Sequence, residues 1–103
     1  MGELGRWMRE TREEKNVTLE ELSQKTKIMK YKLRALEEEN FDVFEAEIYL
    51  KGALRRYAEE VGLSSQKVLA KYRQLYRPET EGENEETRTG FFELLWEYIR
   101  RLF

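Results

Sequence analysis

A capping box beside a short turn is the feature that most restricts what this chain can fold into. Thr18 and Glu21 stand three residues apart, so that a hydroxyl and a carboxylate can each satisfy a backbone N–H group at a helix start. The apolar spacing that follows predicts one helix over about 19–26 and another over about 30–39, with residues 27–29 as the turn between them. Two short helices joined in this way form a helix-turn-helix unit.

Three further helices are predicted around this unit from apolar residues at helical spacing. They cover residues 3–15, about 46–61 and about 65–76. Gly52 falls in the middle of the second of these, where glycine costs roughly 1 kcal/mol against alanine, so we expect a close helix–helix contact there. The chain is therefore predicted to be all-α, with a five-helix bundle over residues 1–77.

Composition excludes several classes of function. The chain has no Cys, and so has neither a disulfide framework nor a thiolate zinc site. It also has no His, the commonest general base and metal ligand. The sequence contains no Gly-rich phosphate loop and no nucleophile motif. We therefore expect a binding module and not an enzyme, without catalytic residues, a metal site or a cofactor.

The last quarter of the chain changes composition twice. Residues 78–90 begin at a helix-stopping proline and are polar and acidic, which predicts a flexible, solvated linker. Residues 91–103 are then abruptly apolar, and their charged side chains fall on one stripe of a helix. This pattern predicts an amphipathic C-terminal helix.

Two interpretations of residues 91–103 stay open. In the favoured one the segment lies beside a membrane, with an apolar side in the interface and basic residues on the cytoplasmic side. The membrane-proximal residues would be Phe91, Phe92, Trp96, Arg100 and Arg101. In the other interpretation the helix docks on the domain or on a partner chain. No apolar run reaches the roughly 18–20 residues of a transmembrane helix and no signal peptide is visible, so the chain as it stands is expected to be soluble.

Two sets of motifs resemble known families. The pairs Leu4-Gly5, Met8-Arg9, Arg12-Glu13, Val17-Thr18 and Glu21-Leu22 resemble the opening of lambda-Cro-type helix-turn-helix domains. Further on, residues 3–77 as a whole resemble the N-terminal domain of the RodZ family of bacterial cell-shape proteins. The motifs that carry this second resemblance are Phe41-Asp42-x-Phe44, Ile48-Tyr49-Leu50-Lys51-Gly52-Ala53-Leu54-Arg55-Arg56-Tyr57-Ala58, Gly62-Leu63 and Leu69-x-x-Tyr72.

The resemblance to the RodZ family implies a fold, a partner and a location. Members of that family place a lambda-Cro-type bundle in the cytoplasm and follow it with a linker and one transmembrane helix. Their cytoplasmic domain binds MreB, the bacterial actin homologue, and links its filaments to the inner membrane for rod-shape maintenance. The resemblance therefore implies a structural adaptor on the cytoplasmic side of the inner membrane, in a full-length protein that crosses it once. Ser23 and Lys27 depart from the family pattern, which usually has alanine or glycine there.

The alternative is a DNA-binding transcriptional regulator. Lys30, Lys32 and Arg34 on the third predicted helix would reach a major groove, or would simply form a solvated helix face. The run Glu37 to Glu39 follows on the same helix, and further carboxylates come after it, where they would repel a phosphate backbone. The chain also has a net charge of -2, so nucleic acid is not the expected partner.

The protein-binding interpretation places the interface on the fourth predicted helix. Aromatic and arginine side chains on one exposed helix face suit the centre of a protein interface. The candidate residues are Tyr49, Lys51, Ala53, Arg55, Arg56 and Tyr57. The basic members would suit an acidic partner surface, whereas Tyr57 equally fits a half-buried core tyrosine.

Overall fold

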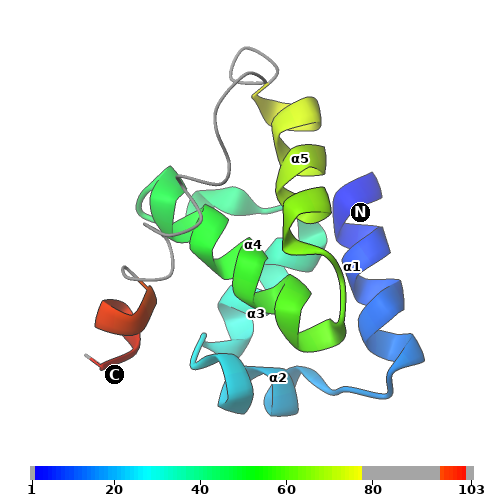
Figure 1. The fold of residues 1–103 in the computed structure, drawn as a ribbon, viewed down its shortest axis with the longest axis vertical. Coiled ribbons are helices and arrows are strands. Elements are labelled where there is room, and N and C mark those ends of the chain that lie inside the picture. The colour runs from blue at the N-terminus through cyan, green and yellow to red at the C-terminus, as the bar shows by residue number, and fades with distance from the viewer. Residues whose placement is uncertain (1, 78–95, 102–103) are drawn as a thin grey trace.

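The computed structural model describes residues 2–77 and 96–101, and helices are their only regular secondary structure (Figure 1). The elements are α1 (Glu3–Glu14), α2 (Leu19–Thr26), α3 (Lys30–Glu38), the short 3-10 helix η1 (Phe41–Val43), α4 (Glu47–Val61) and α5 (Ser65–Tyr76). Residues 96–101 are also helical. The predicted all-α bundle is thus confirmed, whereas the predicted linker 78–90 lies outside the described residues.

Local signals place the helix ends where the capping residues predict them. The Thr18 hydroxyl accepts a hydrogen bond of 3.1 Å from the Glu21 backbone N–H at the start of α2. The Ser64 hydroxyl does the same for α5, accepting from the Lys67 backbone N–H at 3.3 Å. Gly62 ends α4 in the left-handed conformation, with φ of 82°. Each of these contacts satisfies a backbone group that a helix end leaves without a partner.

The α4 helix is the centre of the bundle (Figure 1). It contacts α1, α2, α3 and α5, and the apolar side chains of all five helices meet around it. The fully buried large side chains include Leu4, Met8, Leu22, Leu33, Leu36, Leu54, Tyr57, Val61 and Val68. A helix surrounded by four others buries most of its circumference. Several residues predicted to form a binding site on α4 are therefore buried.

The close helix–helix contact lies at Gly5 and not at Gly52. A Cβ atom on Gly5 would stand 1.9 Å from the backbone oxygen of Glu37, so α1 and α3 approach each other where α1 has no side chain. At Gly52 the nearest side-chain atom to an added Cβ is Cε3 of Trp96, at an ordinary 3.6 Å. A helix does contact α4 at Gly52, but it is the helix of residues 96–101, and it lies at an ordinary contact distance where a Cβ atom would also fit.

A buried charge cluster joins α1, α3 and α4. The Nε atom of Arg12 lies 2.7 Å from Oε2 of Glu37, and both side chains are almost fully shielded from solvent. The hydroxyl of Tyr57 donates to the same carboxylate, and Nη1 of Arg12 donates to the Val17 carbonyl at 2.8 Å. Burial, together with the neighbouring Glu37 carboxylate, raises the pKa of Tyr57 far above its ordinary value.

The side chain of Glu39, which is distant in the sequence, caps the N-terminus of α1. Gly2 precedes α1 and offers no side-chain cap, but the Glu39 carboxylate accepts a 2.8 Å hydrogen bond from the Gly5 backbone N–H and another from the Tyr76 hydroxyl. Residues 37–39 therefore do not form a uniformly solvated acidic end of α3. Among the three, only Glu38 is exposed.

Candidate protein-binding surface

The residues predicted for protein binding on α4 do not share an exposed face. Tyr57, Ala53 and Lys51 are buried, whereas Tyr49 is 41% exposed near the start of the helix. Helical periodicity finds one buried stripe, but a central helix packs on several sides at once and leaves little free surface. The predicted common exposed face of α4 is therefore wrong. Of these residues, Tyr49 is the one whose side chain is exposed enough to contact a partner directly.

The basic side chains of α4 are engaged by carboxylates of the same helix. Arg55 lies 3.3 Å from Glu59, and Arg56 lies 3.2 Å from Glu59 and 3.0 Å from Glu60. Such pairs at i+3 and i+4 are the ordinary electrostatic pattern of a helix surface. An acidic partner would have to compete with these intrahelical carboxylates for the same guanidinium groups.

Lys51 belongs to a second cluster, which ties α4 to α5. Its Nζ atom lies 3.4 Å from Glu47, and the same carboxylate accepts from the Tyr72 hydroxyl at 3.0 Å and from Arg77 at 2.6 Å. Partial burial works to raise the pKa of Glu47, but the Tyr72 hydroxyl and the two cations outweigh it and hold that pKa below its ordinary value. Lys51 therefore has a structural partner within the domain.

A groove lies between the α2–α3 turn, the segment after η1 and the first half of α4. Its volume is about 340 Å³, and its apolar lining from the bundle comes from Ile28, Met29, Phe44, Tyr49 and Ala53. Met29 at the turn is 58% exposed, and Tyr31 on α3 is 54% exposed. We call Phe44 and Tyr49, which stand beside Met29, the aromatic rim of this groove. Exposed aromatic and methionine side chains around a concavity are typical of protein interfaces.

The sequence-based prediction of the protein-binding surface did not include Ile28, Met29 or Phe44, which line this groove. Phe44 belongs to the irregular apolar stretch after α3, and its ring lies 5.9 Å from Nζ of Lys32. The sequence does show an apolar stretch at residues 41–44 and a methionine in the turn at residues 27–29. That these two segments form one groove depends on α4, which passes beside both of them.

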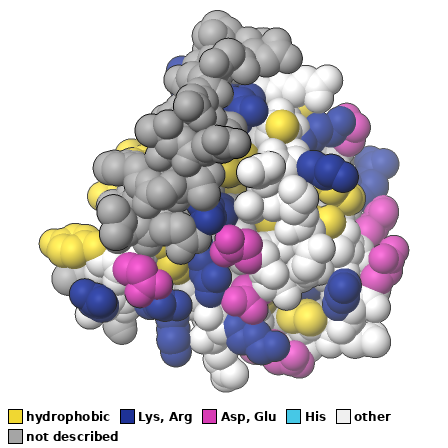
Figure 2. Space-filling model, in the orientation of Figure 1, with side chains coloured by type: hydrophobic (Ala, Val, Ile, Leu, Met, Phe, Trp, Pro, Cys, Tyr) yellow, Lys and Arg dark blue, Asp and Glu magenta, His cyan; other side chains and the backbone are white. Residues whose placement is uncertain are grey.

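The residues of the DNA-binding alternative lie together on α3 but differ in their surroundings. Lys30 forms an ion pair with Glu20 of α2, and Lys32 sits above Phe44, whereas Arg34 is exposed. Basic and acidic side chains are also interspersed over the face that Figure 2 shows. The Glu20 carboxylate partly neutralises Lys30, which weakens the attraction of that side chain to a phosphate backbone.

The described part of the C-terminal segment lies against the bundle. Trp96 packs on the hydrophobic core and lines the groove together with Ile99. Glu97 pairs with Arg100 at 2.6 Å, and Arg101 is exposed. This arrangement matches the docking interpretation, while Phe91 and Phe92 lie outside the described residues. Within residues 2–77 and 96–101, no helix has the length and apolar character that a membrane crossing requires.

The described residues also contain no cluster of three or more carboxylates that is arranged to hold a metal ion. The groove, with its aromatic rim, is thus the strongest candidate binding feature, and its chemistry suits another apolar surface.

This architecture is that of a small all-α helix-turn-helix domain. The helix-turn-helix domain family matches residues 7–68, and the chain belongs to that family. The chain is also similar to YmfM, an uncharacterized membrane protein of Bacillus subtilis (strain 168), with 35% identity over 57 residues. The match covers 55% of this chain but only 20% of the Bacillus protein. No solved structure matches this chain.

Proposed function

We propose that this chain is an adaptor that binds the bacterial actin homologue MreB and links its filaments to the inner membrane for rod-shape maintenance. The proposal rests first on the resemblance of residues 3–77 to the RodZ family. Membership of the helix-turn-helix family and the similarity to a protein named as a membrane protein are consistent with it. In this proposal the domain lies on the cytoplasmic side of the membrane.

The observation that carries the protein-binding part is the groove with its aromatic rim. Tyr49 and Met29 are exposed at its edges, while the basic residues of α4 are engaged by their own carboxylates. Burial of aromatic side chains dominates the affinity of many protein interfaces. We therefore propose that MreB contacts the rim and that Tyr49 is its main anchor.

One observation favours the DNA-binding alternative. Lys30, Lys32 and Arg34 all project from α3, the second helix of the helix-turn-helix unit, which enters the major groove in DNA-binding members of this class. Binding by these residues would weaken steeply with salt, because it would release counterions from the phosphate backbone.

Co-sedimentation of the chain with polymerised MreB, beside a gel shift with random duplex DNA at physiological salt, separates the two functions. The adaptor proposal expects saturable pelleting and no shift. A tight, salt-dependent shift without pelleting would instead support the regulator, and Lys30, Lys32 and Arg34 would then be the residues to replace.

The matched variants are Tyr49→Ala and Leu75→Ala. Both side chains are 41% exposed, but Leu75 lies on α5 and does not line the groove. We expect Tyr49→Ala to weaken pelleting by about 30-fold, as for an interface anchor worth about 2 kcal/mol, and Leu75→Ala to leave it unchanged. Equal binding by the two variants would rule out the rim as the contact surface. Tyr57→Ala is unsuitable as a surface probe, because the Tyr57 hydroxyl belongs to the buried cluster.

A further inference from the structure

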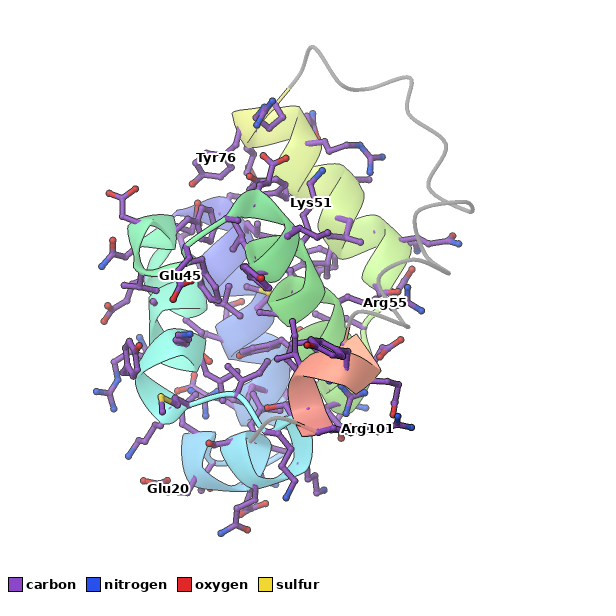
Figure 3. The ribbon with its side chains drawn as sticks, turned by 90° about the vertical axis from the view of Figure 1, so that its left-hand side faces the viewer. Glu20, Glu45, Lys51, Arg55, Tyr76 and Arg101 are labelled. Atoms are coloured by element: carbon purple, nitrogen blue, oxygen red, sulfur yellow. The ribbon has the colours of Figure 1, made fainter. Side chains whose placement is uncertain are left out.

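A segment of the chain itself packs along the groove. One wall of it is the short helix of residues 96–101, which lies in front of α4 in Figure 3. Trp96 sits over Gly52, at the one position of α4 where no side chain projects, and Ile99 lies one helical turn further along the same groove. A tryptophan and an isoleucine at i and i+3 form one face of a helix, so both reach the groove together.

The contact is apolar and incomplete. Trp96 Nε1 is buried without an acceptor, and the ion pair of Arg100 with Glu97 stays within the segment. The segment forms one wall of the groove and leaves its volume of about 340 Å³ open, whereas the side chains of a permanent core are closely packed. A buried donor without a partner also weakens the docked state relative to the solvated one. Because of these features, an apolar surface that fits the groove better can displace residues 96–101 from it.

We propose that the groove is a helix-binding site for an amphipathic helix with an aromatic and an aliphatic residue at i and i+3. Residues 96–101 occupy it in cis. Because Tyr49 and Ala53 line the same groove as Trp96 and Ile99, the docked segment masks the Ala53 side of the surface assigned above to MreB, and Tyr49 stays 41% exposed beside it. This masking rests on the proposed function, whereas the docking itself does not.

Tryptophan fluorescence tests the docking. The chain has two tryptophans, so the Trp7→Phe background leaves Trp96 as the reporter. In that background Gly52→Leu places a side chain where Trp96 lies, while Gly52→Ala adds only a methyl group at an ordinary contact distance of 3.6 Å. We expect Gly52→Leu to shift the Trp96 emission to longer wavelength and to increase its quenching by acrylamide several-fold.

Gly52→Ala is the control, and we expect it to keep the emission and quenching of the background. Helical circular dichroism verifies that all variants are folded. If Trp96 is quenched equally in the background and in Gly52→Leu, the segment is not docked in solution and the proposal is overturned.

Co-sedimentation with polymerised MreB tests the masking. Trp96→Ser removes the main docking side chain and leaves the groove residues of the bundle unchanged, and Tyr98→Ser removes an aromatic residue from the same helix that is 63% exposed. We expect Trp96→Ser to tighten binding on the order of tenfold, because the fraction of open groove increases. Tyr98→Ser should leave binding unchanged.

The outcomes separate the two proposals. If wild type and Trp96→Ser bind MreB equally, masking is overturned and the adaptor function stands. If no variant pellets, the adaptor function and the masking of an MreB surface both fail. The fluorescence result then still decides whether the groove binds residues 96–101.

Discussion

Glu37 shows how much one side chain can hold together in a small helical domain. Its carboxylate receives Arg12 from α1 and Tyr57 from α4, so a single residue of α3 joins three helices. The next residue, Glu38, is also a glutamate but is exposed. A buried ion pair contributes little in comparison with apolar packing, but removal of one partner leaves a buried charge without compensation.

Replacement of Glu37 by alanine is therefore expected to lower the free energy of unfolding by about 3–5 kcal/mol, since it strands the Arg12 guanidinium in the core. Glu38→Ala is the matched control, and its effect should stay within about 0.5 kcal/mol. Urea denaturation followed by circular dichroism measures both. Similar midpoints for the two variants would show that the buried cluster does not stabilise the fold.

At the scale of the elements, some helix ends have favourable caps, whereas others end at a residue other than glycine in the unfavourable left-handed conformation. Lys27 ends α2 in the left-handed conformation, with φ of 63°, and its N–H donates to the Ser23 carbonyl at 2.8 Å. Asn16 and Glu39 adopt the same conformation. Asparagine tolerates it, but a lysine without a local side-chain hydrogen bond does not gain from it.

Lys27→Gly is expected to stabilise the domain. The left-handed conformation costs an L residue roughly 1–2 kcal/mol, and the extra freedom of glycine in the unfolded chain removes part of the gain, so we expect about 0.5–1 kcal/mol. Lys25→Gly, two residues earlier and within α2, should instead destabilise by about 1 kcal/mol. Thermal unfolding compares the two. A loss of stability in Lys27→Gly would mean that the turn does not hold residue 27 in the left-handed region.

The whole bundle is tied at its edges by tyrosine–carboxylate contacts. Tyr72 of α5 donates to Glu47 of α4, and Tyr76 donates to Glu39 at the end of α3. Burial and the adjacent carboxylates raise the pKa of Tyr72 and that of Tyr76 to about 12 each. Since free tyrosine titrates near pH 10, folding favours the protonated hydroxyls.

Stability should therefore be lost in the alkaline range. A raised pKa in the folded state gives a contribution that is complete below about pH 10 and disappears as the pH rises towards 12. We expect the melting temperature to fall across this interval, with a smaller fall for Tyr72→Phe, which cannot ionise there. Tyr31→Phe, on an exposed side chain, is the control. An equal fall of the melting temperature in the wild type and in Tyr72→Phe would contradict this expectation.

The sequence by itself determined the helices, their approximate ends and the class of fold. Apolar periodicity, the Thr18 cap, the Ser64 cap and Gly62 act within a few residues, and such local interactions can be read from the chain directly. The turn at residues 27–29 was also predicted, because it lies between two well-marked helices. The family motifs are of the same local kind.

Only the tertiary structure decided which side chains form a surface. Tyr57 is buried because α4 runs through the centre of the bundle, a position that its own periodicity does not encode. Ala53 is buried in the groove that Trp96 also lines, and Lys51 is buried beside Glu47. The roles of Glu37 and Glu39 depend on contacts with α1 residues that stand 25 and 34 positions away in the chain. The groove exists because the α2–α3 turn, Phe44 and α4 converge. Convergence of this kind follows from packing of the whole molecule, since helices with the same local pattern can pack in more than one way.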